Sequence, residues 1–500
     1  MERLHEQVKT LGELKESGWK SKTVKDELRI NLIRKIEKDE PVFTGIKGYD
    51  KTVLPQLQHA ILARHDFILL GLRGQGKSRM LRMLPQLMDE YIPAIAGSEI
   101  NDDPLNPLSK FSHDLIEEKG NDTPIEWLHR SQRYGEKLAT PDTTVADLIG
   151  DIDPIKAATK RLTLGDEHVI NFGIVPRTNR GIFVINELPD LQPRIQVALL
   201  NIMQERDIQI RGFNVRIPLD IQMAFSANPE DYTNRGNLIT PLKDRIDSQI
   251  LTHYPKEIDV GMEITNQEAW IVRQDGLEIH VPDFIKELVE EVAFEARHSE
   301  YIDQKSGVST RLTITAMEQI ISAAERRMIM NSEDESTVRV ADLYHMVPAL
   351  TGKLELVYEG EQEGALNVAH HLIGKALDKV FKRGFPDPQK KRSEEDKVYG
   401  EIVNWFAKGN MLELPDYLPE KRYRKLLSEV DGLEELVDER GKASDEAEKW
   451  VLMDFVIETL HQNSMLGKDD LDDIRTYTDM VGSMLGSLND LDDEDLDELE

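Results

Sequence analysis

The sequence predicts an α/β protein in which a parallel sheet lies between helices and a helical region follows. Three short apolar runs carry this prediction: FILL at 67–70, IFVI at 182–185 and IQMAF at 221–225. Helical stretches separate these runs, and this alternation is typical of a parallel sheet covered on both faces. The chain has 500 residues. Single cores stop growing near roughly 250–300 residues, so we expect more than one structural unit.

The pattern along the chain divides it into six segments. Up to about residue 40, the spacing of Leu4, Val8, Leu11 and Leu14 predicts an amphipathic helix. LTITAMEQIISAAERRMIM and VAHHLIGKALDKVF are strongly helical, and FPDPQKKRSEED is a break rich in proline and charge. We expect an N-terminal helical segment (1–41), an α/β domain (42–255), an α-helical lid (256–384), a linker (385–397), a helical C-terminal unit (398–467) and an acidic tail (468–500).

Composition excludes several classes of function. The formal net charge of −31 argues against general binding of nucleic acid, since phosphate backbones favour basic surfaces. The absence of cysteine excludes disulfides and thiolate chemistry and fits a reducing compartment. The charged N-terminus lacks the apolar core of a signal peptide, and no run approaches the ~18 apolar residues of a membrane span. We therefore predict a soluble, cytoplasmic protein with no membrane partner.

A phosphate-binding loop follows the first apolar run. GLRGQGKS at 71–78 matches G-x-x-x-x-G-K-[ST] without a gap. Glycines let backbone N–H groups wrap a phosphate, and the start of the following helix favours its charge. Lys77 is predicted to reach the β- and γ-phosphates and Ser78 to ligate Mg²⁺, and Pro85 predicts a kink in the helix. The predicted cofactor-binding residues are Gly71, Leu72, Arg73, Gly74, Gln75, Gly76, Lys77, Ser78 and Arg79.

The second apolar run ends in the acidic motif that such a loop requires. In RGIFVINELPDLQ (180–192), Glu187 stands where a water-activating glutamate is expected. The preceding position, usually an aspartate that holds the metal, is Asn186. An amide can accept a hydrogen bond from metal-bound water but brings no charge, so we expect Asn186 to contact Mg²⁺ through water and turnover to be reduced. A buried strand with a polar edge is the alternative.

Three further residues complete the predicted catalytic set. Asn228 follows a strand that we expect to neighbour the loop strand, where it can orient water together with Glu187. Arg245, in LITPLKDRIDSQI, is a candidate for reaching a neighbouring subunit's γ-phosphate; a salt bridge to Asp244 or Asp247 is the alternative. Arg311 opens a predicted lid helix, a position at which helix dipoles disfavour a cation, and this favours contact with phosphate over a purely surface role.

In this order, the motifs resemble the AAA+ superfamily, specifically its clade of MoxR proteins and magnesium-chelatase I-subunits. The resemblance covers roughly residues 42 to 350. VFTGIKGYDKTVLPQLQHAIL resembles the clade's opening segment near the adenine, and TTVADLIGDIDP with GDEHVINFGIVPRTNRGIFVINE resembles the helix-2 insert running into the Walker B strand. NIMQERDIQIRGFNVRIPLD resembles the pre-sensor-1 hairpin, and SANPE with PLKDRI the sensor-1 and arginine-finger stretch.

The resemblance implies an AAA+ P-loop fold, ATP and Mg²⁺ as cofactors, and a ring of identical subunits, commonly a hexamer. It implies that Glu187 is catalytic, Asn228 is sensor 1, Arg245 is the finger and Arg311 is sensor 2, and that Arg177 reaches a neighbouring subunit. Relatives are often paired with a separate protein that carries a von Willebrand A domain. Residues 99–138 and those after about 385 lie outside the resemblance, and Asn186 departs from it.

Three functional hypotheses follow. The first is a ring ATPase that remodels a protein partner, in the manner of a chaperone, or helps to load a metal or cofactor. The second is a nucleotide-gated scaffold with little hydrolysis, motivated by Asn186. The third is a true magnesium chelatase motor, for which the sequence shows no porphyrin site.

Overall fold

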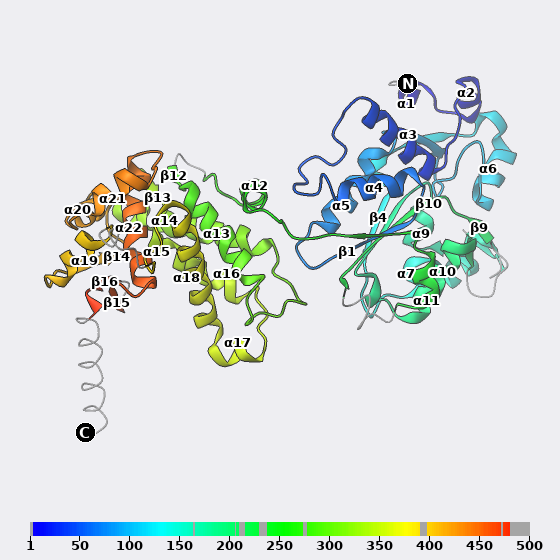
Figure 1. Ribbon diagram of the computed structural model, residues 1–500. Helices are drawn as coiled ribbons and strands as arrows, with labels where there is room; N and C mark the ends of the chain where they lie inside the picture. Colours follow the sequence, from blue (N-terminus) through cyan, green and yellow to red (C-terminus); the bar gives the residue numbers. More distant parts are fainter. Residues whose placement is uncertain are drawn as a thin grey trace. The chain divides into compact units, whose positions relative to one another are not determined.

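The computed structural model describes residues 4–163, 166–205, 207–209, 216–229, 238–273, 278–390, 398–471 and 474–480. The chain forms two compact units, Met1–His253 and Tyr254–Glu500, which Figure 1 traces in order of sequence. None of the helices in the described ranges is long and apolar enough to cross a membrane.

The first unit is built on a five-stranded sheet of order β11-β1-β10-β7-β4. Every neighbouring pair in it is parallel, so the predicted parallel sheet is confirmed. The three apolar runs lie in β1, β7 and β10, whereas β4 and β11 were not predicted. The strands are β1 (Phe67–Leu70), β4 (Tyr134–Leu138), β7 (Gly181–Asn186), β10 (Ile221–Ala227) and β11 (Ser248–Leu251).

Alternating side chains of these strands build two apolar layers. Phe67 and Leu69 of β1 belong to one core cluster, and Ile68 and Leu70 belong to the other, as the period of two in a strand requires. Helices cover both faces (Figure 1). On one face lie α3 (Val24–Glu37), α4 (Val53–Leu62) and α5 (Lys77–Met83); on the other lie α7 (Val145–Leu148), α9 (Ile174–Arg177), α10 (Pro193–Glu205) and α11 (Thr240–Arg245).

The N-terminal segment, predicted as one amphipathic helix, consists of three helices. They are α1 (Leu4–Gln7), α2 (Leu11–Glu16) and α3. Thr10 starts α2 with a capping box that involves Glu13, and such a cap marks a new helix start. α3 belongs to the core of the first unit, because Glu27 on it forms a buried ion pair with Arg133, 2.6 Å between Oε2 and Nη2.

Short strand pairs lie around the main sheet. The hairpin predicted before the sensor-1 strand is present as β8 and β9, which are antiparallel; residues 210–215 lie outside the described ranges. Two further antiparallel pairs are formed by β2 with β3 and by β5 with β6. The elements are β2 (Tyr91–Ile95), α6 (Lys110–Lys119), β3 (Ile125–His129), β5 (Gly150–Ile152), α8 (Pro154–Lys160), β6 (Ile170–Phe172), β8 (Asp207–Gln209) and β9 (Arg216–Pro218).

The second unit is mainly helical and has one apolar core, which runs from Val281 to Tyr477. Its helices are α12 (Ile258–Glu268), α13 (Asp283–Ala296), α14 (Arg311–Asn331), α15 (Val340–Leu343), α16 (Val347–Thr351), α17 (Tyr358–Glu363), α18 (Ala365–Gly384), α19 (Gly400–Ala407), α20 (Glu420–Ser428), α21 (Leu433–Arg440) and α22 (Glu446–Gln462). Its strands are β12 (Glu278–His280), β13 (Glu335–Thr337), β14 (Leu412–Pro415), β15 (Gly467–Leu471) and β16 (Ile474–Thr478).

This unit differs from the sequence prediction at two points. The expected lid (256–384) and C-terminal unit (398–467) share the one core, so they are not separate packing units. The expected acidic tail begins too early, because residues 467–471 and 474–478 form β15 and β16 of an antiparallel sheet with β14. The acidic residues Asp469 and Asp470 concealed this strand, in which Lys468 forms an ion pair with Asp470 at 3.1 Å.

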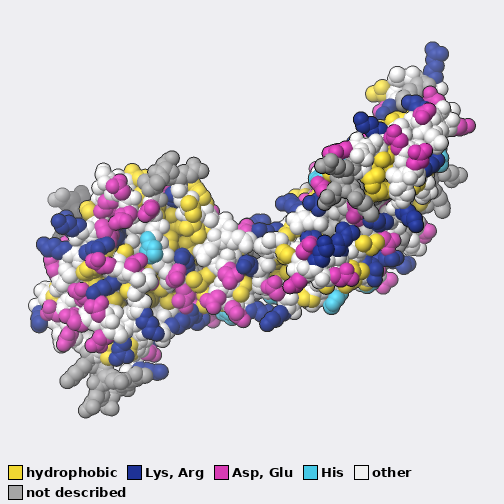
Figure 2. Space-filling model, turned by 90° about the horizontal axis from the view of Figure 1, so that it is seen from above, with side chains coloured by type: hydrophobic (Ala, Val, Ile, Leu, Met, Phe, Trp, Pro, Cys, Tyr) yellow, Lys and Arg dark blue, Asp and Glu magenta, His cyan; other side chains and the backbone are white. Residues whose placement is uncertain are grey.

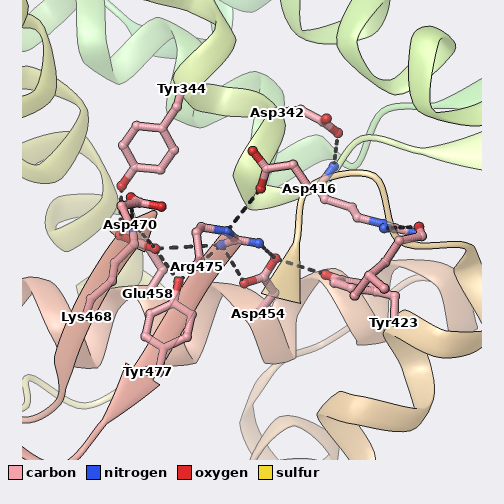
Figure 3. A network of polar contacts seen from close by, with 12 residues as sticks. Asp342, Tyr344, Asp416, Tyr423, Asp454, Glu458, Lys468, Asp470, Arg475 and Tyr477 are labelled. Carbon is pink, nitrogen blue, oxygen red and sulfur yellow. Dashed lines mark hydrogen bonds and ion pairs between the residues drawn. The ribbon is translucent and has the colours of Figure 1, made fainter. Parts of the chain in front are cut away.

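A buried network of charges joins that hairpin to α22 (Figure 3). Asp454 and Glu458 are fully buried on α22, and the Arg475 guanidinium donates to both oxygens of Asp454 at 3.1 and 3.2 Å. Lys468 lies 3.2 Å from Glu458, which also accepts from the Tyr477 hydroxyl. Burial alone raises the pKa of Glu458, but the charges of Lys468 and Arg475 outweigh it and lower the pKa to about 2. Glu458 is therefore charged, and its charge is compensated by cations within the network.

We predict that Arg475→Met destabilises the second unit by about 3–5 kcal/mol, because it leaves Asp454 without its buried counter-charge. Hydrogen exchange of the α22 amides in the intact chain measures this loss. Lys425→Met is the matched control: its side chain is 77% exposed, so a change within about 0.5 kcal/mol is expected. A loss for Arg475→Met no larger than that of the control would contradict the prediction.

Candidate nucleotide-binding site

The predicted phosphate loop connects β1 to α5. Gly74 and Gly76 have φ angles of 75° and 72°, a left-handed conformation that glycine adopts without steric cost. This conformation lets the loop turn back over the end of the strand. The helix continues only to Met83, and Pro85 then lies in a 3₁₀ turn, η1 (Leu84–Leu87). The expected kink at Pro85 is therefore a change of helix type, and Leu84 and Leu87 remain buried.

The Lys77 side chain lies beneath this loop. It is 7% exposed, and its ammonium donates to the backbone oxygens of Gly71 and Leu72, the latter at 3.0 Å. It also lies 3.3 Å from Oδ1 of Asn228. Asn228 directly follows β10, which pairs with β1, so the expectation that its strand neighbours the loop strand is confirmed. The two predicted residues thus meet across adjacent strand ends.

Asn186, the last residue of β7, connects the loop helix to the sheet. Its Oδ1 accepts from the Ser78 hydroxyl at 3.3 Å and from the buried Ser226 hydroxyl at 2.9 Å. The Ser226 oxygen in turn lies 3.4 Å from the backbone N–H of Glu187. Glu187 has a φ of 53°, an uncommon conformation for a residue with a side chain. Ser226, which the sequence analysis missed, therefore holds Asn186 and the Glu187 backbone together.

Glu136 is the second functional candidate that sequence reasoning missed. Its Oε1 accepts from the Asn186 amide nitrogen at 2.6 Å, and the Arg82 guanidinium donates to both of its oxygens at 2.9 Å. Burial raises the pKa of Glu136, but the hydrogen bonds and charge of Arg82 outweigh it and hold that pKa below its usual range. The group is thus a carboxylate, located on a strand whose charged sequence YGEKL gave no apolar signal.

A buried polar cluster holds the start of the loop. The Thr252 hydroxyl donates to Oε1 of Gln75 at 2.6 Å, and the Tyr49 hydroxyl lies 2.9 Å from the backbone oxygen of Gln75 and 2.7 Å from that of His253. The segment around Tyr49, expected near the nucleotide, therefore contacts the loop. A Cβ at Gly71 would lie 1.8 Å from the Thr252 hydroxyl, which explains glycine at this position.

The three arginines predicted outside the loop have different surroundings. Arg245 is the last residue of α11 and is exposed; among the described residues it forms no ion pair, so the alternative of a bridge to Asp244 or Asp247 is not observed. Arg311 is the exposed first residue of α14, in the second unit. Arg177 lies 3.6 Å from Glu99 and 3.2 Å from Asn171 of its own chain.

The chemical groups at this site are of the types that bind a nucleoside triphosphate together with Mg²⁺. A loop with two left-handed glycines and a buried ammonium offers N–H donors and positive charge, which triphosphates require. The Ser78 and Asn186 side chains offer oxygen atoms, the ligands that Mg²⁺ prefers. These features make the site a candidate for binding a nucleoside triphosphate with Mg²⁺.

The arrangement of strands fits the AAA+ P-loop fold that the resemblance in the sequence implies. The strand that carries Asn228 lies between the loop strand and the strand that carries Glu187, in the order β1-β10-β7, and a helical unit follows the sheet.

Comparisons with known proteins found solved structures that have low sequence identity to this chain. No family model matches the chain. One similar solved structure is a proposed ATPase of Cytophaga hutchinsonii, at 18% identity, covering 73% of this chain and 97% of that one, with a TM-score of 0.30. Another is a complex of the magnesium chelatase subunits BchI and BchD, at 18% identity, 64% and 98% coverage and a TM-score of 0.34. A third is NtrX of Brucella abortus in complex with ATP, at 14% identity, 70% and 66% coverage and a TM-score of 0.34.

We predict that Gly71→Ala destabilises the first unit by about 1–3 kcal/mol, because the added methyl group must displace the Thr252–Gln75 hydrogen bond. Hydrogen exchange of the β1 amides measures the loss. Gly384→Ala, where a Cβ meets nothing within 4 Å, is the control. Adding Thr252→Ala to Gly71→Ala should recover part of the stability, and failure to do so would show that the clash lies elsewhere.

Proposed function

We propose that this protein is a ring-forming AAA+ ATPase similar to MoxR proteins and magnesium-chelatase I-subunits. It would couple binding and hydrolysis of ATP to remodelling of a protein partner or to loading of a metal or cofactor. One observation carries the proposal: the start of the loop helix is hydrogen-bonded to the ends of two adjacent parallel strands, through Lys77 to Asn228 and through Ser78 to Asn186.

Different side chains of this protein would have separate roles in ATP hydrolysis. Lys77 would exchange its contacts with Gly71 and Leu72 for phosphate oxygens, since an ammonium gains more from a full negative charge than from neutral carbonyl oxygens. Mg²⁺, when bound beside Ser78, supplies charge neutralisation on the phosphate oxygens. Glu187 accepts the proton of the attacking water, and Asn228 orients that water.

Two arginines would complete the reaction centre from outside the loop. Arg245 is exposed on the first unit, which leaves its guanidinium available to stabilise the developing charge at a neighbouring subunit's nucleotide. Arg311 would contact phosphate from its own chain and report the state of the nucleotide to the second unit. The role of Arg245 requires a ring of subunits, for which a hexamer is the proposed form.

The surface charge favours protein partners over nucleic acid. The net charge is −31, and on the face in view in Figure 2 acidic side chains are interspersed with basic ones over both units. Such a mixed, net acidic surface repels a phosphate backbone. A separate protein that carries a von Willebrand A domain is the proposed partner, and the cytoplasm is the proposed location.

A nucleotide-gated scaffold is the second candidate, and Asn186 favours it. An amide in place of a carboxylate weakens the hold on Mg²⁺, which would slow hydrolysis while leaving ATP bound. Slow turnover of tightly bound ATP by the assembled wild-type protein would identify the scaffold.

We expect Lys77→Ala to weaken ATP binding about 30-fold or more, because removing one partner of a hydrogen-bonded charge pair costs about 2–5 kcal/mol. Isothermal titration with ATP and Mg²⁺ measures the change. The control is Lys20→Ala, an exposed lysine of the same unit, whose affinity should match the wild type. Equal affinities in all three proteins would overturn the proposed site.

For Arg245→Ala we expect unchanged ATP affinity and a fall in turnover of about 10³-fold or more, as for the loss of an arginine finger. Steady-state ATP hydrolysis is the measurement, with the exposed Arg194→Ala as control. Mixing Arg245→Ala subunits with Lys77→Ala subunits should restore part of the activity, since each supplies what the other lacks. Full activity of Arg245→Ala alone would rule out the role in trans.

A further inference from the structure

The carboxylate of Glu136 accepts a hydrogen bond from the amide of Asn186, the residue that replaces the usual aspartate. Glu136 lies on β4 and Asn186 on β7, and these two strands are neighbours in parallel register, with Leu138 opposite Asn186. The Glu136 Oε1 atom is 2.6 Å from the Asn186 nitrogen. The negative charge absent at position 186 is thus present one strand further from the loop.

This contact fixes which way the Asn186 amide faces. A carboxylate can only accept hydrogen bonds, so the NH₂ group must point to Glu136 and the carbonyl oxygen to the opposite side. On that side the carbonyl oxygen accepts from the hydroxyls of Ser78 and Ser226. The reversed amide would set two oxygens 2.6 Å apart and is excluded.

Glu136 is itself held in one orientation. Arg82 donates to both of its oxygens, and the Tyr134 hydroxyl donates to Oε2 at 3.1 Å. The Arg82 side chain is 64% exposed, whereas that of Glu136 is 19% exposed. The bridge alone is worth little to stability, because exposed ion pairs contribute about 0–1 kcal/mol. Its geometric effect is to leave Oε1 directed at Asn186.

We propose that Glu136 is a positioning residue that holds the Asn186 carbonyl oxygen toward Ser78, so that an amide–carboxylate pair on two strands replaces the single aspartate of the metal site. This inference rests on the proposed function, since it assigns the chain's own residues toward Mg²⁺. The hydrogen bond to a carboxylate also polarises the amide and increases the negative charge on its oxygen.

The pairing of Glu136 with Asn186 predicts what an aspartate at position 186 would do. Asn186→Asp alone would place two carboxylates in contact where one hydrogen bond now stands, and like charges at that separation repel. The aspartate should therefore damage the site and not improve it. Exchanging both groups, Glu136→Gln with Asn186→Asp, restores a donor opposite an acceptor and moves the charge onto β7.

The experiment compares wild type, Glu136→Gln, Asn186→Asp and the double variant in the full-length chain. Glu117→Gln, the same substitution at an exposed residue of α6, is the matched control. ATP affinity is measured with Mg²⁺ and with EDTA, and the ratio of the two gives the contribution of Mg²⁺. Thermal unfolding without nucleotide gives a second measurement that does not depend on ATP.

In each single variant, we expect the ratio of ATP affinity with Mg²⁺ to that with EDTA to fall by about tenfold or more. The affinity measured in EDTA should not change. The double variant should recover the wild-type gain, so that the two substitutions are strongly non-additive. Without nucleotide, Asn186→Asp should melt at a lower temperature than wild type, and the double variant should melt near it.

Two results would overturn the inference alone: a normal Mg²⁺ effect in Glu136→Gln, or losses that simply add in the double variant. A purely structural role of Glu136 as the partner of Arg82 predicts that additive result, because changing Asn186 would not then repair its loss. Wild-type protein that binds no ATP in either condition would instead overturn the proposed function, and this inference with it.

Discussion

The parallel register of three strands is the constraint on which the site depends. β1 pairs with β10, and β10 pairs with β7, so their carboxyl ends meet at one edge of the sheet. Apolar layers on both faces fix that register, since a slip of one residue would exchange every inward side chain between layers. Lys77, Asn186 and Asn228 are far apart in sequence, and this register, together with the loop that follows β1, brings them to one site.

In this site, hydrogen bonds connect a surface ion pair to a buried amide and then to a hydroxyl. From the solvent inward, Arg82 contacts Glu136, Glu136 contacts Asn186, and Asn186 contacts Ser78. Each contact restricts the next side chain to one orientation, so an exposed pair of small energetic value acquires a geometric role. The site therefore depends on the outermost strand of the sheet, and the usual pairing of loop and acidic motif is incomplete without it.

The sequence predicted those parts of the fold and site that carry a strong local signal. The loop at 71–78, the strands ending at Asn186 and Asn228, and the hairpin before the latter strand are all found. β4 was missed because an edge strand is charged and lacks the apolar run of a central strand, and with it Glu136 was missed. Ser226 was missed because a serine within an apolar strand gives no sign of its partners. The β15–β16 hairpin was hidden by the acidic residues of β15, one of which, Asp470, forms an ion pair with Lys468 of the same strand.

The buried charge network means that the core of the second unit needs the β15–β16 hairpin. Asp454 and Glu458 lie in the middle of α22, and their cationic partners, Lys468 and Arg475, come later in the sequence. A chain that stops within the first strand of the hairpin would retain two buried carboxylates without a guanidinium to neutralise them. During synthesis, the core of this unit therefore reaches its final packing only after the hairpin has emerged, so completion of the fold is tied to the last described strand.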